Sequence, residues 1–172
     1  MKQNALKFFA SGAFISYLPT AILKNKKNTG AGLLGSIEAF FIYLILGPMS
    51  FWAYFFLLIG IILFATYISQ KVEFDGTEDN PKIVIDEIAG FFVSAAFLPY
   101  SFTTAILALI LFRIFDTTKL AFIKKAENIA AKLPPETRKK YCLKGAEIVL
   151  DDVLAGIVSN LILWILIFCK IL

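Results

Sequence analysis

Long apolar runs separated by short polar connections make up most of the sequence. Residues 49–69 form the clearest run, about 20 consecutive residues without a charge, and residues 153–172 form another at the C-terminus. A helix of about 20 apolar residues is long enough to cross the roughly 30 Å hydrocarbon core of a bilayer. The pattern therefore predicts helices that span a membrane, the last of them preceded by a short lead-in at residues 145–152.

The stretch 84–112 decides the predicted topology. A straight helix of this length would be about 42 Å long, which exceeds the apolar core and would carry Asp86 and Asp116 to opposite faces. Leu98-Pro-Tyr-Ser101 offers a break near the middle, because proline disrupts a helix interior. We therefore expect a hairpin of two short helices that returns to its starting face.

The N-terminal residues 1–23 differ from these spans. Their apolar run is interrupted by Ser11-Gly12 and Pro19 and is closed by a lysine cluster. We therefore expect an interfacial or re-entrant helix rather than a full span. A glycine-rich turn follows at residues 29–36 and opens an apolar helix that runs to about residue 46.

Composition and charge agree with a membrane protein. The 172 residues are 59% hydrophobic with a mean hydropathy of +0.77, above the roughly 45–50% apolar content of soluble proteins, and the length suits one domain covering residues 1–172. The expected fold class is all-α: an integral membrane helical bundle with a short broken-helix hairpin and an interfacial N-terminal helix. The net charge of +4 comes from basic connections at residues 24–27 and 113–144, a positive-inside pattern that indicates a cytoplasmic face rather than a nucleic-acid partner.

The residue types present exclude several chemistries. The chain has no histidine, which removes mechanisms that need an imidazole nucleophile, base or zinc ligand. Neither Cys142 nor Cys169 has metal-ligand spacing or opens a loop that ends in arginine. A covalent cysteine phosphatase is therefore not expected.

Two similar motifs place adjacent acids directly before a long apolar run. They are Ile83-Val-Ile-Asp-Glu-Ile-Ala-Gly90 and Ile148-Val-Leu-Asp-Asp-Val-Leu-Ala-Gly156. An ionised side chain within a bilayer costs at least roughly 2.5–3.5 kcal/mol on insertion scales, so such acids indicate a functional site. A third motif, Phe112-Arg-Ile-Phe-Asp-Thr-Thr-Lys119, places its arginine, aspartate and lysine on one broad helix face. The predicted topology brings all three motifs to the cytoplasmic end.

Converging carboxylates repel one another, and a divalent cation would resolve that conflict. An all-oxygen site without histidine or thiolate suits Mg²⁺ or Mn²⁺, and basic side chains and a glycine-rich helix start at the same face suit phosphate. The expected metal ligands are Asp86, Glu87, Asp151 and Asp152, with Asp79 as a further candidate. The expected phosphate-binding residues are Arg113, Lys119, Lys144, Gly35 and Ser36. The expected catalytic residues are Asp86, Glu87, Asp116, Asp151 and Asp152.

These residues support phosphoryl transfer, with hydrolysis by a metal-activated water as its simplest form. Two alternatives remain open. A membrane phosphotransferase of phospholipid headgroups would use the same acids, although no Asp-Gly-x-x-Ala-Arg run is present, because Asp75-Gly76 is followed by Thr-Glu. A divalent-cation carrier would use the acids as an ion site.

The three motifs resemble the signature stretches of the phosphatidylglycerophosphatase A family, and Gly32-Leu-Leu-Gly-Ser36 resembles a degenerate form of its N-terminal glycine turn. The similarity covers about residues 10–165. It implies a Mg²⁺-dependent hydrolase of phospholipid biosynthesis that removes the terminal phosphate from phosphatidylglycerophosphate, giving phosphatidylglycerol, at the cytoplasmic face of the inner membrane. It also implies that Asp86, Glu87, Asp151 and Asp152 match the family's acidic positions, and that Arg113, Asp116 and Lys119 match its middle motif.

Overall fold

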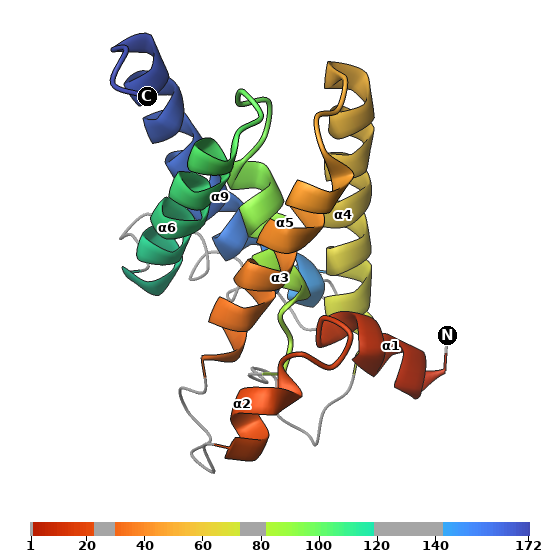
Figure 1. Ribbon diagram of the computed structural model, residues 1–172. Coiled ribbons are helices and arrows are strands. Elements are labelled where there is room, and N and C mark those ends of the chain that lie inside the picture. The colour runs from red at the N-terminus through yellow and green to blue at the C-terminus, as the bar shows by residue number, and fades with distance from the viewer. Residues whose placement is uncertain (1, 23–29, 73–81, 119–142) are drawn as a thin grey trace.

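The structure is a computed structural model that describes residues 2–22, 30–72, 82–118 and 143–172, and every regular element in these ranges is an α-helix. Figure 1 shows the helices and their order. Their bounds are α1 (Gln3–Ala10), α2 (Tyr17–Ile22), α3 (Ala31–Leu46), α4 (Phe51–Lys71), α5 (Ile85–Ser94), α6 (Phe102–Thr118) and α9 (Leu143–Phe168). The all-α fold class is therefore confirmed for the described residues.

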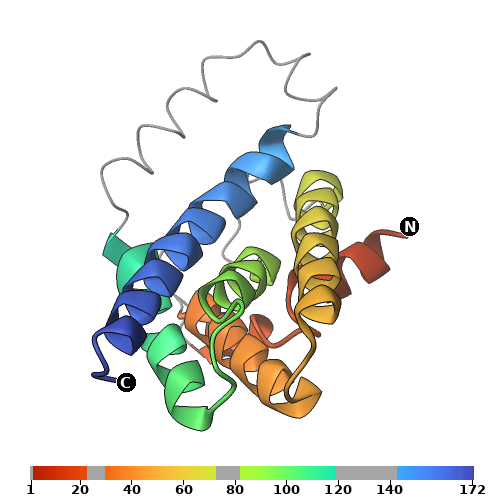
Figure 2. The ribbon, with the colours of Figure 1, turned by 90° about the horizontal axis from the view of Figure 1, so that it is seen from above.

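Helix α5 lies at the centre of the bundle. Seen from above, it is surrounded by α3, α4, α6 and α9 (Figure 2), and it packs against each of them. Its Phe91 and Phe92 are 0% and 1% exposed, so α5 supplies the middle of the hydrophobic core. Both of its ends are fixed. The Val84 N–H donates to the Ala10 carbonyl at 2.8 Å, and the Asn160 amide donates to the carbonyls of Ser94 and Ala96.

The predicted broken-helix hairpin is confirmed. The chain turns through residues 95–101 and returns along α6, so that α5 begins and α6 ends at the same end of the bundle (Figure 1). Ser101 starts α6 in the manner of a helix cap, because its hydroxyl accepts the Thr104 N–H at 3.0 Å. Asp86 and Asp116 consequently lie on the same side of the molecule.

Two described helices, α4 and the Gly145–Phe168 part of α9, are long and apolar enough to cross a membrane. The predicted helix at residues 49–69 appears as Phe51–Lys71, because the Ser50 hydroxyl caps its first turn by accepting the Ala53 N–H at 3.3 Å. Only four residues of α4 are buried, and Trp52, Phe56 and Leu63 each have 65–66% of their surface exposed. Such an apolar outer face is unusual on a soluble monomer and is consistent with contact to lipid.

The N-terminal helices α1 and α2 contain 8 and 6 residues, too few for a span of about 20 residues. Neither helix is long enough for a full span, and the chain forms two helices rather than the one expected; the interfacial or re-entrant placement stays a prediction. Figure 1 shows both at the end of the bundle where α5 begins. The Ser16 hydroxyl donates to the Lys82 carbonyl at 2.8 Å and ties this segment to the start of α5.

The prediction that residues 145–152 form a short lead-in before the last helix is wrong. Helix α9 begins at Leu143, so Asp151 and Asp152 lie more than two turns inside it. Residues 145–152 continue the helix because Gly145 fits closely against α4, where its N–H donates to the Gln70 side chain at 2.9 Å.

Two glycines allow α5 and α9 to pack closely. A Cβ atom at Gly156 would overlap with the Gly90 carbonyl, whereas a Cβ at Gly60 on α4 would meet no atom within 4 Å.

We expect Gly156→Ala to destabilise the protein by about 1–3 kcal/mol through overpacking against backbone. Gly60→Ala should be neutral or stabilising by up to about 1 kcal/mol. Thermal unfolding of both variants in detergent measures the difference, and equal midpoints would contradict the close-packing argument.

Candidate metal and phosphate site

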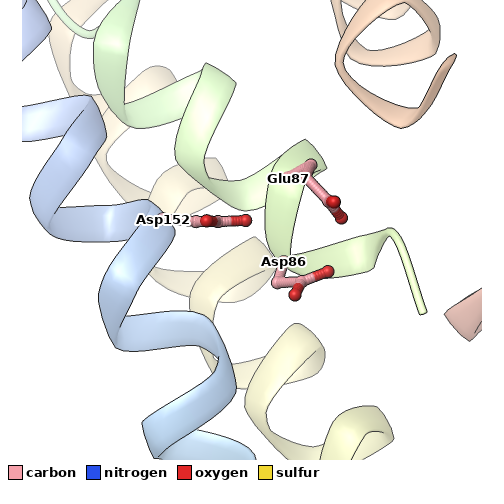
Figure 3. Close-up of side chains that lie close together, drawn as sticks. All are labelled: Asp86, Glu87 and Asp152. Atoms are coloured by element: carbon pink, nitrogen blue, oxygen red, sulfur yellow. The ribbon is translucent and has the colours of Figure 1, made fainter. Parts of the chain in front are cut away.

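Three carboxylates from two helices converge at the end of the bundle where α5 begins. Asp86 and Glu87 lie in the first turn of α5, and Asp152 reaches toward them from α9 (Figure 3). One carboxylate oxygen from each lies within 4.8 Å of the other two. These three are the group of potential metal ligands among the described residues.

The crossing of α5 and α9 explains why the acids meet. Residues four apart lie on the same face of a helix, so Asp86 lies one turn before Gly90, and Asp152 lies one turn before Gly156. The two glycines face each other at the crossing, and a Cβ at Gly90 would come within 2.8 Å of the Asp152 carbonyl oxygen. Because both helices run from the same end of the bundle (Figure 1), the acids one turn earlier converge as well.

The surroundings of these acids favour a bound cation. Asp152 is only 5% exposed, and Asp86 and Glu87 are partly exposed. Asp86 Oδ1 and Glu87 Oε2 are buried and have no hydrogen-bond partner among the described residues. Burial raises the pKa of Asp86, and it raises the pKa of Glu87 well above its usual range, with the charges of Asp86 and Asp152 adding to the shift. Ionising all three carboxylates together therefore requires a compensating positive charge.

The donor atoms fit a hard divalent cation. All are carboxylate oxygens, and the two buried oxygens without partners are available as ligands. Mg²⁺ and Mn²⁺ prefer such ligands, whereas zinc sites use mainly nitrogen and sulfur. Three carboxylates would also leave coordination positions of an octahedral ion for water or phosphate.

Arg113 of α6 lies beside the three carboxylates. Its Nη1 forms a 2.8 Å ion pair with Asp116 Oδ2 and donates to Ser36 Oγ at 3.1 Å. Asp116 is close enough that its negative charge contributes to the raised pKa of both Asp86 and Glu87. A guanidinium next to a group of carboxylates that could hold a metal ion is the pairing expected of a phosphate site.

Comparison with known proteins agrees with this geometry. A model of the phosphatidylglycerophosphatase A family matches residues 8–167. The chain belongs to that family. It is also similar to a protein of Bacteroides thetaiotaomicron named "Putative phosphatidylinositol-3-phosphatase", with 28% identity over 141 residues that cover 79% of this chain and 80% of the relative. Both names denote phosphatases, which supports assignment of this protein to the phosphatase hydrolases. No solved structure matches the chain.

The glycine turn of this phosphatidylglycerophosphatase A family member packs against the start of α5 and lies beside Arg113, and the phosphate-binding role of Gly35 and Ser36 stays a prediction. Gly35 packs against Val84, where an added Cβ would lie 2.7 Å from the Val84 Cβ. Ser36 is fully buried, and its hydroxyl donates to the Gly32 carbonyl at 2.9 Å. Gly32 was not among the predicted site residues, yet an added Cβ there would overlap with Glu87 Oε1. Its i, i+4 spacing to Ser36 was the sequence signal that could have identified it.

The remaining predicted residues are only partly placed. Asp151 is not a member of the three-carboxylate group, because it precedes Asp152 by one residue and so lies about 100° around the axis of α9. Asp79 and Lys119 lie outside the described residues. The backbone of Lys144 belongs to α9, but its side chain is outside the described part of the structure.

Proposed function

We propose that this protein is a membrane-embedded, Mg²⁺-dependent phosphatidylglycerophosphatase. It would hydrolyse the terminal phosphomonoester of phosphatidylglycerophosphate to phosphatidylglycerol and inorganic phosphate. The observation that carries the proposal is the convergence of Asp86, Glu87 and Asp152 within 4.8 Å of one another. Membership of the family supports the choice of substrate.

A lipid substrate fits the outer surface of the molecule. Helices α4 and α9 are long and apolar enough for a bilayer, and Asp86 and Glu87 lie in the first turn of α5, at the end of the bundle where α1 and α2 also lie (Figure 1). A phosphate headgroup at the lipid–water boundary could therefore approach the acids while its acyl chains stay in the membrane. The positive-inside pattern of the basic connections at residues 24–27 and 113–144 supports a cytoplasmic location for this site.

Each group has a distinct part in the proposed reaction. Asp86, Glu87 and Asp152 would hold the ion, with Asp151 as a further ligand or catalytic acid still to be tested. When bound, Mg²⁺ supplies charge stabilisation and a water of lowered pKa. Arg113 has five N–H donors; its contacts to Asp116 Oδ2 and Ser36 Oγ are made by Nη1, and the other three donors are on Nε and Nη2. These three donors would bind the phosphoryl oxygens.

The products follow from the atoms that react. A water oxygen forms a bond to phosphorus, and the bond between phosphorus and the ester oxygen breaks. A carboxylate of the cluster accepts the proton of the attacking water. That proton is passed on to the leaving oxygen, which departs as the hydroxyl of phosphatidylglycerol, so that the carboxylate returns to its ionised form.

Phosphate release from defined lipids tests this proposal. The purified protein in mixed micelles should hydrolyse phosphatidylglycerophosphate with Mg²⁺, and chelation by EDTA should abolish activity until Mg²⁺ is restored. Phosphatidylinositol 3-phosphate, the substrate class suggested by the relative's name, is the comparison lipid, and glycerol 3-phosphate is the soluble one. Preference for the inositol lipid would overturn the substrate assignment. Equal activity in EDTA would overturn the role of the ion.

A further inference from the structure

Ser36 and Arg113 form a polar link between α3 and α6 beside the carboxylates. Residues 36 and 113 are far apart in sequence, yet Arg113 Nη1 lies 3.1 Å from Ser36 Oγ. The hydroxyl has a fixed direction, because its own proton is donated to the Gly32 carbonyl at 2.9 Å. Ser36 Oγ therefore presents a lone pair, rather than its proton, to the guanidinium.

The arrangement leaves the Ser36 hydroxyl poorly suited to bind a phosphate directly. Ser36 is 0% exposed, and its single proton is already donated within α3. A phosphate oxygen needs a donor, and Ser36 can offer one only by breaking that bond. By contrast, Arg113 retains a side chain that is 19% exposed and has three N–H donors on Nε and Nη2.

Asp116 and Ser36 hold the same nitrogen from two sides. Nη1 has two hydrogens, of which one is directed to Asp116 Oδ2 at 2.8 Å and the other to Ser36 Oγ at 3.1 Å. Asp116 lies one turn further along α6, whereas Ser36 is on a different helix. An ion pair between two side chains of the same helix does not fix the position of the guanidinium, because the two side chains can move together. The contact to α3 fixes the plane of the guanidinium relative to the carboxylates of α5.

The geometry points to Ser36 as a positioning residue, which acts on the phosphate through Arg113 and does not contact it. This inference rests on the proposed function for its catalytic consequence, but the orientation of Arg113 can be measured without any substrate. It changes the role expected from the glycine turn alone, in which Ser36 itself binds phosphate.

A double-mutant cycle separates the two roles. If Ser36 acts through Arg113, Ser36→Ala should lower kcat/KM about 10-fold, in the range seen for groups that support a ligand. The same change should have no further effect when Arg113 is already alanine, because residues that act as a unit are not additive. Ser36→Thr, which keeps a hydroxyl able to bond the i−4 carbonyl, should restore most of the activity. A direct phosphate contact would instead give additive losses, and that result would overturn the inference.

A chemical readout distinguishes failure of this inference from failure of the proposed function. Phenylglyoxal modifies arginine side chains, and peptide mass spectrometry reports the rate at Arg113 in the full-length protein without lipid. Ser36→Ala should raise that rate several-fold, since Nη1 loses a partner. Ser159→Ala is the matched control: Ser159 is also fully buried and donates to its i−4 carbonyl at 2.8 Å, in α9. An unchanged rate in Ser36→Ala, or an equal rise in Ser159→Ala, would overturn the positioning role even if the wild-type protein proved inactive on every lipid.

Discussion

Replacement of Asp152 by asparagine is expected to lower phosphate release at least about 100-fold, since changes to groups that only support metal ligands already cost about 10–100-fold. Asn keeps the size of the side chain but removes its charge. Asp152 supplies the only carboxylate of the three that comes from α9, so its loss leaves two adjacent acids on one helix turn. Those two cannot surround an ion in the same way.

The fold of Asp152→Asn should survive. Asp152 is 5% exposed and faces two other carboxylates, so removal of one charge reduces repulsion when no cation is bound. We expect a thermal midpoint in EDTA equal to or above that of the wild type, and a smaller rise on addition of Mg²⁺. Glu38→Gln is the matched control, because it replaces another partly buried helical carboxylate that lies outside the three-carboxylate group. Full activity of Asp152→Asn, or an equal loss in Glu38→Gln, would contradict the assigned site.

Gly32→Ala is expected to lower activity about 100-fold without unfolding the protein. A Cβ atom at this position would overlap with Glu87 Oε1 and lie 3.4 Å from Arg113 Nη1. The Glu87 carboxylate must move to admit the methyl group, and a displacement of about 1 Å at a reacting group can cost about 100-fold in rate. Alanine is otherwise the better helix former, so the stability of α3 should not decrease.

The comparison with Gly60→Ala isolates the effect of position. Both variants add one methyl group to a helical glycine, but Gly60 has no atom within 4 Å of the added Cβ. Gly60→Ala should keep wild-type activity. The concentration of Mg²⁺ that gives half-maximal activity should rise in Gly32→Ala and stay constant in Gly60→Ala. An unchanged Mg²⁺ requirement in Gly32→Ala would show that this glycine is not needed for the placement of Glu87.

Several features of the fold could be predicted because they depend on local pattern. The hairpin followed from Pro99 in the middle of an apolar stretch that was too long for one span, and the structure places the turn at residues 95–101. The apolar helix α4 followed from its uncharged run. The adjacent acids of two similar motifs, together with the predicted hairpin, indicated carboxylates that converge, and three of the four predicted ligands, Asp86, Glu87 and Asp152, do so.

Other features needed the tertiary structure. Helix α9 begins at Leu143 because Gly145 fits against α4, a contact that no local pattern contains. Asp151 and Asp152 are equivalent in the sequence, but the direction of the crossing with α5 selects Asp152 for the three-carboxylate group. The roles of Gly32 and Ser36 likewise depend on how close α3 lies to Glu87 and Arg113.

The sequence by itself determined an all-helical, strongly apolar chain with three polar motifs and the acidic residue types that suit a divalent ion, because composition and helical periodicity are properties of neighbouring residues. Only the tertiary structure decided which carboxylates share a site and which side chain holds Arg113. Those choices depend on the angle and depth at which helices distant in sequence cross, and that geometry is set by the glycines and core side chains at each contact.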